Sequence, residues 1–348
     1  MKRPNGKDGN LFLKIQSCIF RAKINSLVGK LLHNSEINRT EWDQLVAGSP
    51  QGSVFVESWY LDTILPGEWS GIAVYEDNTL VAIMPVMIRN KWGFSYALQP
   101  VMAKYWGIIF ENKTFHNTYK ELSFKKKAVN TILDCIPQKL SYLSYNFHPD
   151  FDYPLPFYWK SYQLNSSFTY ILDVIGSPEA EIFNSYSPEL KNSIRTAQKN
   201  EITIQEDHRS PALINILEKN KHGGKTIYEP QYYPVLSKVL ETGLSNGKSF
   251  SLTAVDNKGN AVASSIYMKD NKSIYALIHV MAKSASKTDA LSLLVHHAIL
   301  KSAELNLKFD FLGSMIEPVE AFNRRFGAQP VSFHTISKKN QLLSLIAK

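Results

Sequence analysis

Residues 310–330 read DFLGSMIEPVEAFNRRFGAQP, and this stretch decides the fold of the second half of the chain. An apolar strand over residues 308–312 ends at Gly313. The helix that follows closes at Gly327, a residue type that forms left-handed helix caps. Residues 331–336 then read as a strand. Strand, helix and strand in this order predict an α/β layer.

The segment before this stretch shows the same alternation. Residues 274–280 are mostly apolar and predict a strand, and a polar loop over residues 282–287 follows it. Thr288 or Asp289 then opens a helix. Because a strand is followed here by a helix N-terminus, the sequence predicts a ligand site at this point.

Two short sequences with the same spacing predict one β-hairpin in each half of the chain. Ala73-Val74 stands eight positions before Val81-Ala82, and Ala254-Val255 stands eight positions before Val262-Ala263. Each pair flanks a polar turn, which is typical of adjacent antiparallel strands. The match either reflects a duplication of the fold or arises by chance, since alanine and valine are common.

The composition favours a folded protein of two domains. The chain has 348 residues, of which 44% are hydrophobic and 20% charged, and domains usually hold about 100 to 200 residues. Its net charge of +8 is concentrated in residues 1–35, so the remainder gives no sign of a surface that follows nucleic-acid phosphates. Two cysteines are too few for a disulfide framework or a zinc site.

Residues 11–32 predict a basic amphipathic helix, because apolar residues recur mostly three and four positions apart among lysines and arginines. Such a helix docks on the body of the protein, mediates dimer contacts, or lies on a membrane that carries anionic lipid. No stretch approaches the roughly 18 apolar residues of a membrane span. We therefore expect a cytoplasmic protein, with peripheral contact to the inner face of the membrane as the open alternative.

Three motifs in a fixed order resemble the Fem-type transferases, a family of GNAT-like acyltransferases. Residues 187–204, SPELKNSIRTAQKNEITI, are similar to the basic helix and strand that open the second domain of that family. Residues 284–291, SASKTDAL, stand in the place of its donor-phosphate loop, and residues 310–330 resemble its closing helix. The resemblance implies an α/β (α+β) protein with two tandem GNAT-like domains, each a mixed, mostly antiparallel sheet flanked by helices. The implied divisions are an N-terminal segment (1–35), a first domain (36–165) and a second domain (166–348) whose last strand can return to the first.

The resemblance also implies where an acyl donor would bind. Donor phosphates in GNAT-like folds are held by backbone N–H groups at a helix start, where partial positive charge gathers. The corresponding residues of this chain are Lys287, Thr288, Asp289, Ala290 and Leu291. The loop departs from the common GNAT pattern because it has no glycine, and the Asp289 carboxylate would either repel a phosphate or cap the helix.

The acceptor is expected to contact basic and hydroxyl side chains. Lys191 and Arg195 lie four positions apart and share one face of the helix over residues 190–199. Arg195 resembles the family's acceptor-binding basic residue, and a guanidinium binds phosphate in bidentate fashion. A solvated basic face would show the same spacing. The remaining expected substrate contacts are Tyr228, Ser314 and Arg324.

Acyl transfer requires a proton acceptor and a hydrogen-bond donor for the developing oxyanion. Tyr275 and His279 are expected on one face of their strand, where His279 is either the base or a buried histidine without a chemical role. Asp310 is the candidate carboxylate, and relatives often carry a second acid two residues later, where this chain has Leu312. His296-His297 does not predict a metal site, because adjacent helix residues point in different directions.

These features predict an acyltransferase that uses acetyl-CoA or another acyl-CoA and no metal. Its acceptor would be an amine or hydroxyl of an amino sugar, a lipid-linked glycan or another cell-envelope precursor. The second hypothesis is an aminoacyl-tRNA donor, as in the peptidoglycan-bridge enzymes of the family, although the nearly neutral body counts against RNA binding. The third is a non-catalytic glycan- or partner-binding module, favoured by the missing loop glycine and by Leu312.

Overall fold

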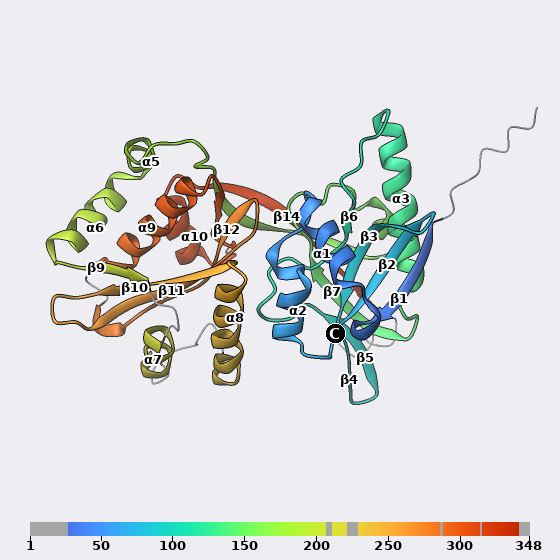
Figure 1. Cartoon of the computed structure of the whole chain (residues 1–348), viewed down its shortest axis with the longest axis horizontal. Helices are drawn as coiled ribbons and strands as arrows, with labels where there is room; N and C mark the ends of the chain where they lie inside the picture. The colour runs from blue at the N-terminus through green and yellow to red at the C-terminus, as the bar shows by residue number, and fades with distance from the viewer. Residues whose placement is uncertain (1–26, 207–210, 221–228, 286–287, 314, 341–348) are drawn as a thin grey trace, which may run out of the picture.

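The computed structural model describes residues 27–206, 211–220, 229–285, 288–313 and 315–340. They form two halves that lie side by side, each containing β-strands flanked by helices (Figure 1). The N-terminal half is on the right of Figure 1 and the C-terminal half on the left.

The first half contains a small antiparallel sheet. Its strands in spatial order are β1 (Val28–His33), β2 (Ser70–Glu76), β3 (Thr79–Val86) and β6 (Ile109–Phe110). Helix α3 (Thr118–Cys135) packs on β1, β2 and β3, and α1 (Arg39–Gly48) packs on β3 and β6. Asp77 and Asn78, both with positive φ, form the tight turn between β2 and β3, which is the geometry of a two-residue hairpin.

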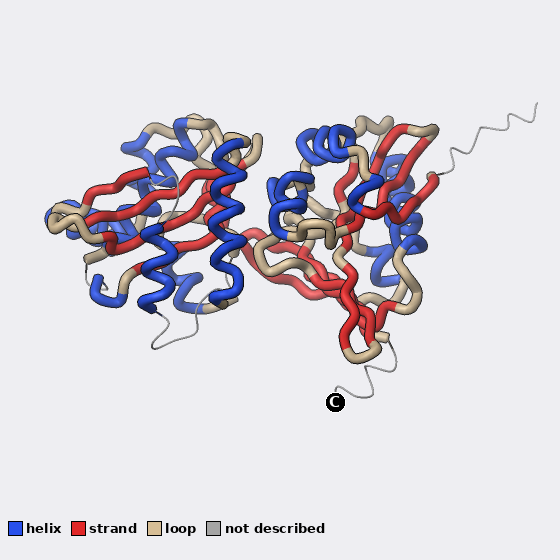
Figure 2. Tube along the Cα trace, turned by 60° about the horizontal axis from the view of Figure 1, so that its bottom comes forward, coloured by secondary structure: helices blue, strands red, loops and turns tan. Residues whose placement is uncertain are grey.

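A second, larger sheet runs through both halves. Its strands in spatial order are β4 (Ile88–Lys91), β5 (Phe94–Leu98), β7 (Leu140–Asn146), β14 (Gln329–Lys339), β8 (Gln163–Leu172), β13 (Lys308–Asp310), β12 (Ser273–Met281), β11 (Ala261–Lys269), β10 (Ser249–Val255) and β9 (Thr203–Glu206). The pairs β5–β7 and β12–β13 are parallel, and the other pairs are antiparallel. Strand β14 pairs with β8 over residues 329–337 and with β7 over residues 335–339, so it joins the halves through backbone hydrogen bonds (Figure 2).

Helices cover both faces of the sheet in the second half. The helices of the second half are α5 (Glu179–Ser185), α6 (Pro188–Lys199), α7 (Pro211–Asn220), α8 (Tyr233–Ser245), α9 (Ala290–Glu304) and α10 (Glu317–Arg324). The first half also contains α2 (Ser58–Ile64) and α4 (Leu155–Trp159). Helix α9 packs on β10, β11, β12 and β13, and α6 packs against α9. Helices α7 and α8 lie on the opposite face (Figure 1), where α8 also contacts α2 of the first half.

The buried side chains form two hydrophobic cores, of which the first is shared by both halves and the second lies within the second half. Phe55 of the first half packs on Tyr275 of β12 with 5.2 Å between the ring centroids, and both belong to one continuous cluster of buried side chains. Tyr105 OH of the first half donates a hydrogen bond to Asp310 Oδ2 of β13 at 2.8 Å. Because buried apolar contacts and a buried hydrogen bond cross the junction, the surfaces between the halves are held in a fixed relation.

The expected fold class is confirmed, since mixed and mostly antiparallel sheets are flanked by helices. The strands expected over residues 274–280 and 331–336 are β12 and β14. The helix expected to open at Thr288 or Asp289 is α9, with Asp289 as its N-cap. Gly327 has a φ of 79°, the left-handed conformation expected after α10.

The prediction of a helix over residues 11–32 is wrong for residues 28–32. Residues 28–32 belong to strand β1, which pairs with β2, whereas residues 11–26 lie outside the described part of the chain. Gly29 allows this strand to lie close to α3, because a Cβ there would stand 2.6 Å from Cys135 Sγ and 2.7 Å from Thr131 Cγ2. Among the described residues, no helix combines the length and the apolar character that crossing a membrane requires.

Candidate active site

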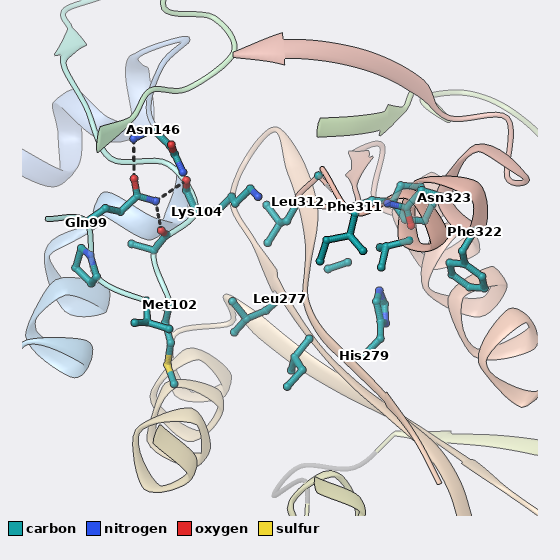
Figure 3. A pocket seen from close by; sticks show the side chains of 18 of the residues that line it. Gln99, Met102, Lys104, Asn146, Leu277, His279, Phe311, Leu312, Phe322 and Asn323 are labelled. Carbon is teal, nitrogen blue, oxygen red and sulfur yellow. Dashed lines mark hydrogen bonds between the residues drawn. The ribbon is translucent and has the colours of Figure 1, made fainter. Parts of the chain in front are cut away.

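A cleft of about 920 Å³ lies between the two halves. One wall belongs to the first half and consists of the loop over residues 98–104 and three side chains of β7, namely Tyr142, Ser144 and Asn146. The other wall consists of β12, the start of α9, the loop after β13 and α10. Figure 3 shows the two walls facing each other. A cleft of this volume is large enough for a substantial organic ligand.

The cleft opens where β12 and β13 separate. Their parallel pairing ends at Tyr275 and Asp310, and the chain then turns away through Gly313, whose φ is 74°. A Cβ at this position would lie 2.4 Å from Phe168 O, so both the conformation and the close approach require glycine. The next residues of β12, 276–279, line the cleft instead of pairing with β13.

A β-bulge in β12 separates Tyr275 from His279. The register between β11 and β12 shifts after Ile266, and the pairing skips Leu277. Tyr275 therefore belongs to the core shared with the first half, while the His279 ring contacts Tyr267 in the second core, with 5.6 Å between the centroids. The expectation that Tyr275 and His279 share a face is wrong, because one extra residue shifts the alternation of side chains.

His279 has one nitrogen without a hydrogen-bond partner. Its Nδ1 lies 2.7 Å from Ser265 Oγ, whereas Nε2 is buried and has no partner among the described residues. When Nδ1 carries the proton and donates a hydrogen bond to Ser265 Oγ, Nε2 carries a lone pair that accepts no hydrogen bond from the described residues. Burial lowers the pKa of His279 from 6.5 to about 4, so the ring is uncharged at neutral pH.

Asn323 on α10 has a second buried polar atom without a hydrogen-bond partner among the described residues. The residue lines the cleft and is 4% exposed, and its Nδ2 has no partner among the described residues. Buried amides are nearly always hydrogen-bonded, and leaving one unpaired costs about 1–3 kcal/mol. Figure 3 shows His279 and Asn323 on the second-half side of the cleft, near Phe311. A ligand carbonyl at this end would accept a hydrogen bond from the amide.

Lys104 lies on the opposite wall. Its side chain extends into the space between the walls (Figure 3), with Nζ 5.7 Å from the centroid of the Phe333 ring, and no ion-pair partner occurs in the described part of the chain. Burial lowers the pKa of Lys104, and the negative charge of Asp310 partly offsets this. Gln99 holds the loop, because its Nε2 donates to Lys104 O at 2.8 Å and its Oε1 accepts from Asn146 N at 2.7 Å.

Several solved structures share this architecture. FemX superposes with a TM-score of 0.65 over 88% of this chain and 96% of its own, at 12% identity. A tandem GNAT protein from the clavulanic acid biosynthesis pathway gives 0.54 over 90% and 98% at 9% identity, and L-PGS from Bacillus licheniformis gives 0.53 over 88% and 93% at 11% identity. The chain has the fold of the Fem-type and tandem GNAT proteins. Neither the family models nor the curated protein sequences give a match.

In this Fem-type fold Asp310 lies beneath the cleft and is 2% exposed. Its Oδ1 accepts hydrogen bonds from Thr169 Oγ1 at 2.5 Å and from Leu312 N at 2.8 Å, and its Oδ2 accepts from Tyr105 OH at 2.8 Å. Burial raises the pKa of Asp310, and these hydrogen bonds oppose the rise. A carboxylate with this many donors is suited to joining the two halves rather than to accepting a proton.

Tyr275 is also held inside the protein. Its OH donates to Asp270 Oδ2 at 2.8 Å, and burial raises its pKa well above the ordinary value. It is 1% exposed and does not belong to the described walls of the cleft. The hydroxyl is therefore committed to a structural hydrogen bond in this arrangement.

The expected donor loop stands at the start of α9, beside the cleft. Leu291 lines the cleft and Ala290 is buried. Asp289 has a φ of 56°, and its side chain caps no N–H of the described residues. Thr288 Oγ1 instead accepts from Ala290 N at 3.4 Å. The Fem-type fold thus brings the helix N-terminus to the cleft, while Lys287 lies outside the described residues.

The basic face of α6 lies away from the cleft. Lys191 Nζ donates to a backbone carbonyl of α5, and the Arg195 guanidinium stands 5.6 Å from the centroid of the Phe183 ring. Helix α6 is at the end of the second half remote from the first half (Figure 1), and Arg324 is exposed on α10. A substrate held by Lys191 and Arg195 would therefore need a site other than this cleft. Two expected substrate contacts lie outside the described residues: Tyr228 and Ser314.

Sequence reasoning missed Asn323 and Lys104. Asn323 follows Val319 by four positions, so an uncharged polar residue continues the apolar face of the closing helix. Lys104 interrupts the otherwise apolar residues 101–108. A polar side chain inside an apolar pattern is the signal that points to each of them.

Proposed function

We propose that this protein transfers an acyl group from an acyl-CoA to an amine or hydroxyl in the cleft between its halves. The observation that carries the proposal is a pair of buried atoms, His279 Nε2 and Asn323 Nδ2, that have no partner among the described residues and lie beside the open part of β12. Unpaired buried polar groups are unfavourable in the free protein. A thioester carbonyl together with an attacking nucleophile would satisfy both atoms.

In the proposed step, Asn323 Nδ2 donates a hydrogen bond to the thioester oxygen, on which negative charge develops. His279 Nε2 accepts the proton of the attacking N–H or O–H group. A C–N or C–O bond forms and the C–S bond breaks. The imidazolium then returns its proton to the CoA thiolate, so free CoA leaves as the thiol. The pKa of about 4 keeps His279 unprotonated at neutral pH, although it also makes the ring a weaker base.

Two features of the second-half wall support an acyl-CoA donor. The open edge of β12 at residues 276–279 offers backbone groups to an extended chain that contains amides, as a free strand edge does for a peptide. Helix α9 begins at the cleft near Leu291, and the positive end of a helix favours phosphate groups. The tandem GNAT protein of similar fold is described in a form without AcCoA, so acetyl-CoA is the first donor to test.

The first-half wall supports a polar acceptor. Lys104 contributes a cation, Ser144 a hydroxyl and Asn146 an amide to that wall. These groups suit a sugar or cell-envelope precursor with an anionic substituent, which Lys104 would neutralise. We infer that the acceptor enters along β7 and meets the donor at His279.

Calorimetric titration tests the donor. We expect acetyl-CoA and CoA to bind. A ligand present at a concentration one hundred times its Kd raises the free energy of unfolding by about 2.7 kcal/mol, so thermal or urea unfolding gives a second measure of binding. Binding of charged tRNA alone, with a steep dependence on salt, would replace the donor by aminoacyl-tRNA. If no acyl-CoA, CoA or charged tRNA binds, the protein is a binding module that keeps the fold.

A further inference from the structure

Three residues on one face of α10 and its N-cap form a lane along the cleft wall. Ile316, Val319 and Asn323 follow one another at spacings of three and four, and all three line the cleft. The exposed fraction falls along this face from 64% at Ile316 to 42% at Val319 and 4% at Asn323. At 1.5 Å per residue, the lane is about 10 Å long from the mouth to the buried amide.

The wall around this lane is polar only at its inner end. Its apolar side chains include Leu277 of β12, Leu291 of α9, Phe311 after β13 and Phe322 of α10. Within the described residues, His279 and Asn323 are the polar side chains of the second-half wall. The wall therefore matches a ligand with one polar group at its inner end and a hydrocarbon chain that leads outward.

The mouth of the lane carries exposed apolar side chains. Met315 is 68% exposed, next to Ile316 at 64%. Neighbouring large apolar side chains at the surface, continuous with a concave site, are a mark of a binding surface. The apolar character of the wall thus extends to the point where a chain would leave the cleft.

We propose that the acyl group of the donor is a hydrocarbon chain of about eight carbons, with its carbonyl at Asn323 and its tail along Val319 and Ile316. This inference rests on the proposed function and narrows its substrate class. An extended chain with bonds of about 1.5 Å advances about 1.25 Å per carbon, so about eight carbons cover the 10 Å lane. An acetyl group would leave Val319 and Ile316 without a ligand contact.

A series of acyl-CoAs of increasing length tests this proposal by calorimetry below their micelle concentrations. Each buried methylene contributes about 0.8 kcal/mol, which corresponds to about fourfold in Kd. Because the lane is partly open, we expect a gain of about two- to fourfold per methylene, and about 60- to 4,000-fold in all for the six methylenes between acetyl-CoA and octanoyl-CoA. The gain should level off for chains that reach beyond the mouth.

The failure of this inference is distinct from the failure of the proposed function. Binding of acetyl-CoA with no gain from butyryl-, hexanoyl- or octanoyl-CoA would overturn the chain-length proposal and leave acyl transfer in place. Absence of binding by CoA and by every acyl-CoA would overturn both.

Exposed residues allow a variant test that does not disturb the core. Val319→Asp puts a charge in the lane and should lower the ratio of octanoyl-CoA to acetyl-CoA affinity at least about tenfold. Ile175→Asp is the control, because Ile175 is 49% exposed in the loop after β8 and does not line the cleft. Its ratio should equal that of the wild type. An unchanged ratio in Val319→Asp would contradict the proposed path of the chain.

Discussion

The second half of the molecule contains two buried polar centres of opposite character. The Asp310 carboxylate accepts hydrogen bonds from Tyr105, Thr169 and Leu312, and it joins the halves beneath the cleft. At the cleft wall, His279 Nε2 and Asn323 Nδ2 have no partners in the described part of the chain. The first centre is complete in the free protein, whereas in the proposed function a ligand completes the second.

This difference separates structural from chemical roles better than residue type does. A carboxylate at a strand end looks like the natural base, yet its hydrogen bonds commit it to the fold. An asparagine in a helix attracts little attention, yet Asn323 lines the cleft and its buried Nδ2 has no partner among the described residues. Substitutions in each centre test whether their roles separate in this way.

The largest expected effect is on catalysis at His279. His279→Ala should lower the rate of acyl transfer about 10²- to 10⁴-fold, because a positioned proton acceptor contributes that much. His296→Ala is the control, since burial also lowers the pKa of His296 to about 4, and its Nδ1 lies 3.1 Å from Tyr186 OH outside the cleft. Steady-state rates with the best donor measure the difference. Equal losses in the two variants would remove the special role of His279.

Asn323→Ala should lower the transfer rate about 10²- to 10³-fold, as loss of an oxyanion donor does. The same change should leave the free energy of unfolding nearly unchanged, because it removes an amide whose Nδ2 has no partner among the described residues. Rate measurements and urea denaturation together check this combination. A large loss of stability with an unchanged rate would assign Asn323 to the structural centre.

Asp310→Ala should show the reverse pattern. It leaves two hydroxyls and one backbone N–H without their acceptor, and each such loss costs about 1–3 kcal/mol. We expect a fall in unfolding free energy of about 3 kcal/mol or more by urea denaturation, with acyl-CoA affinity retained in the folded fraction. Wild-type stability together with a lost reaction would make Asp310 a catalytic carboxylate.

Stability should fall as the pH falls from about 6.5 to about 4. Both His279 and His296 have a pKa of about 4 in the fold because of burial, whereas an exposed histidine titrates near 6.5. These two histidines therefore bind more protons in the unfolded chain than in the fold within this window, so they make the free energy of unfolding rise with pH. His296→Gln should flatten this slope. An unchanged slope by denaturation at several pH values would contradict the assignment.

Arg195→Ala should have the smallest effect. Its guanidinium lies over Phe183 on the far side of the second half, and an exposed cation–π contact is worth about 0.5–1 kcal/mol. We expect unchanged KM values for donor and acceptor, with a slight loss of stability. A raised KM for the acceptor would show that α6 takes part in binding outside the cleft described above.

Local patterns predicted most elements of the second half. The closing helix, its Gly327 cap and the strands on either side followed from spacing and residue type, because these signals lie within a few residues of one another. The fate of residues 28–32 did not follow, since strand β1 depends on pairing with β2 and on contact with α3. Those partners are distant in the sequence.

The site was harder to predict than the fold. His279 was a candidate, but the bulge at Leu277 changed which face it occupies, and a bulge is set by pairing with β11. Lys104 and Asn323 come from different halves, so their meeting at one cleft depends on the junction between them. The residues around Lys104 and around Asn323 in the sequence do not indicate that the two side chains line the same cleft.

A crystal structure with a non-hydrolysable ketone analogue of an acyl-CoA would test the central claim most directly. We expect the acyl chain along α10 and the ketone oxygen within about 2.7–3.2 Å of Asn323 Nδ2, with His279 Nε2 facing the position of the attacking group. An analogue bound with its carbonyl away from both side chains, or outside the cleft, would contradict it.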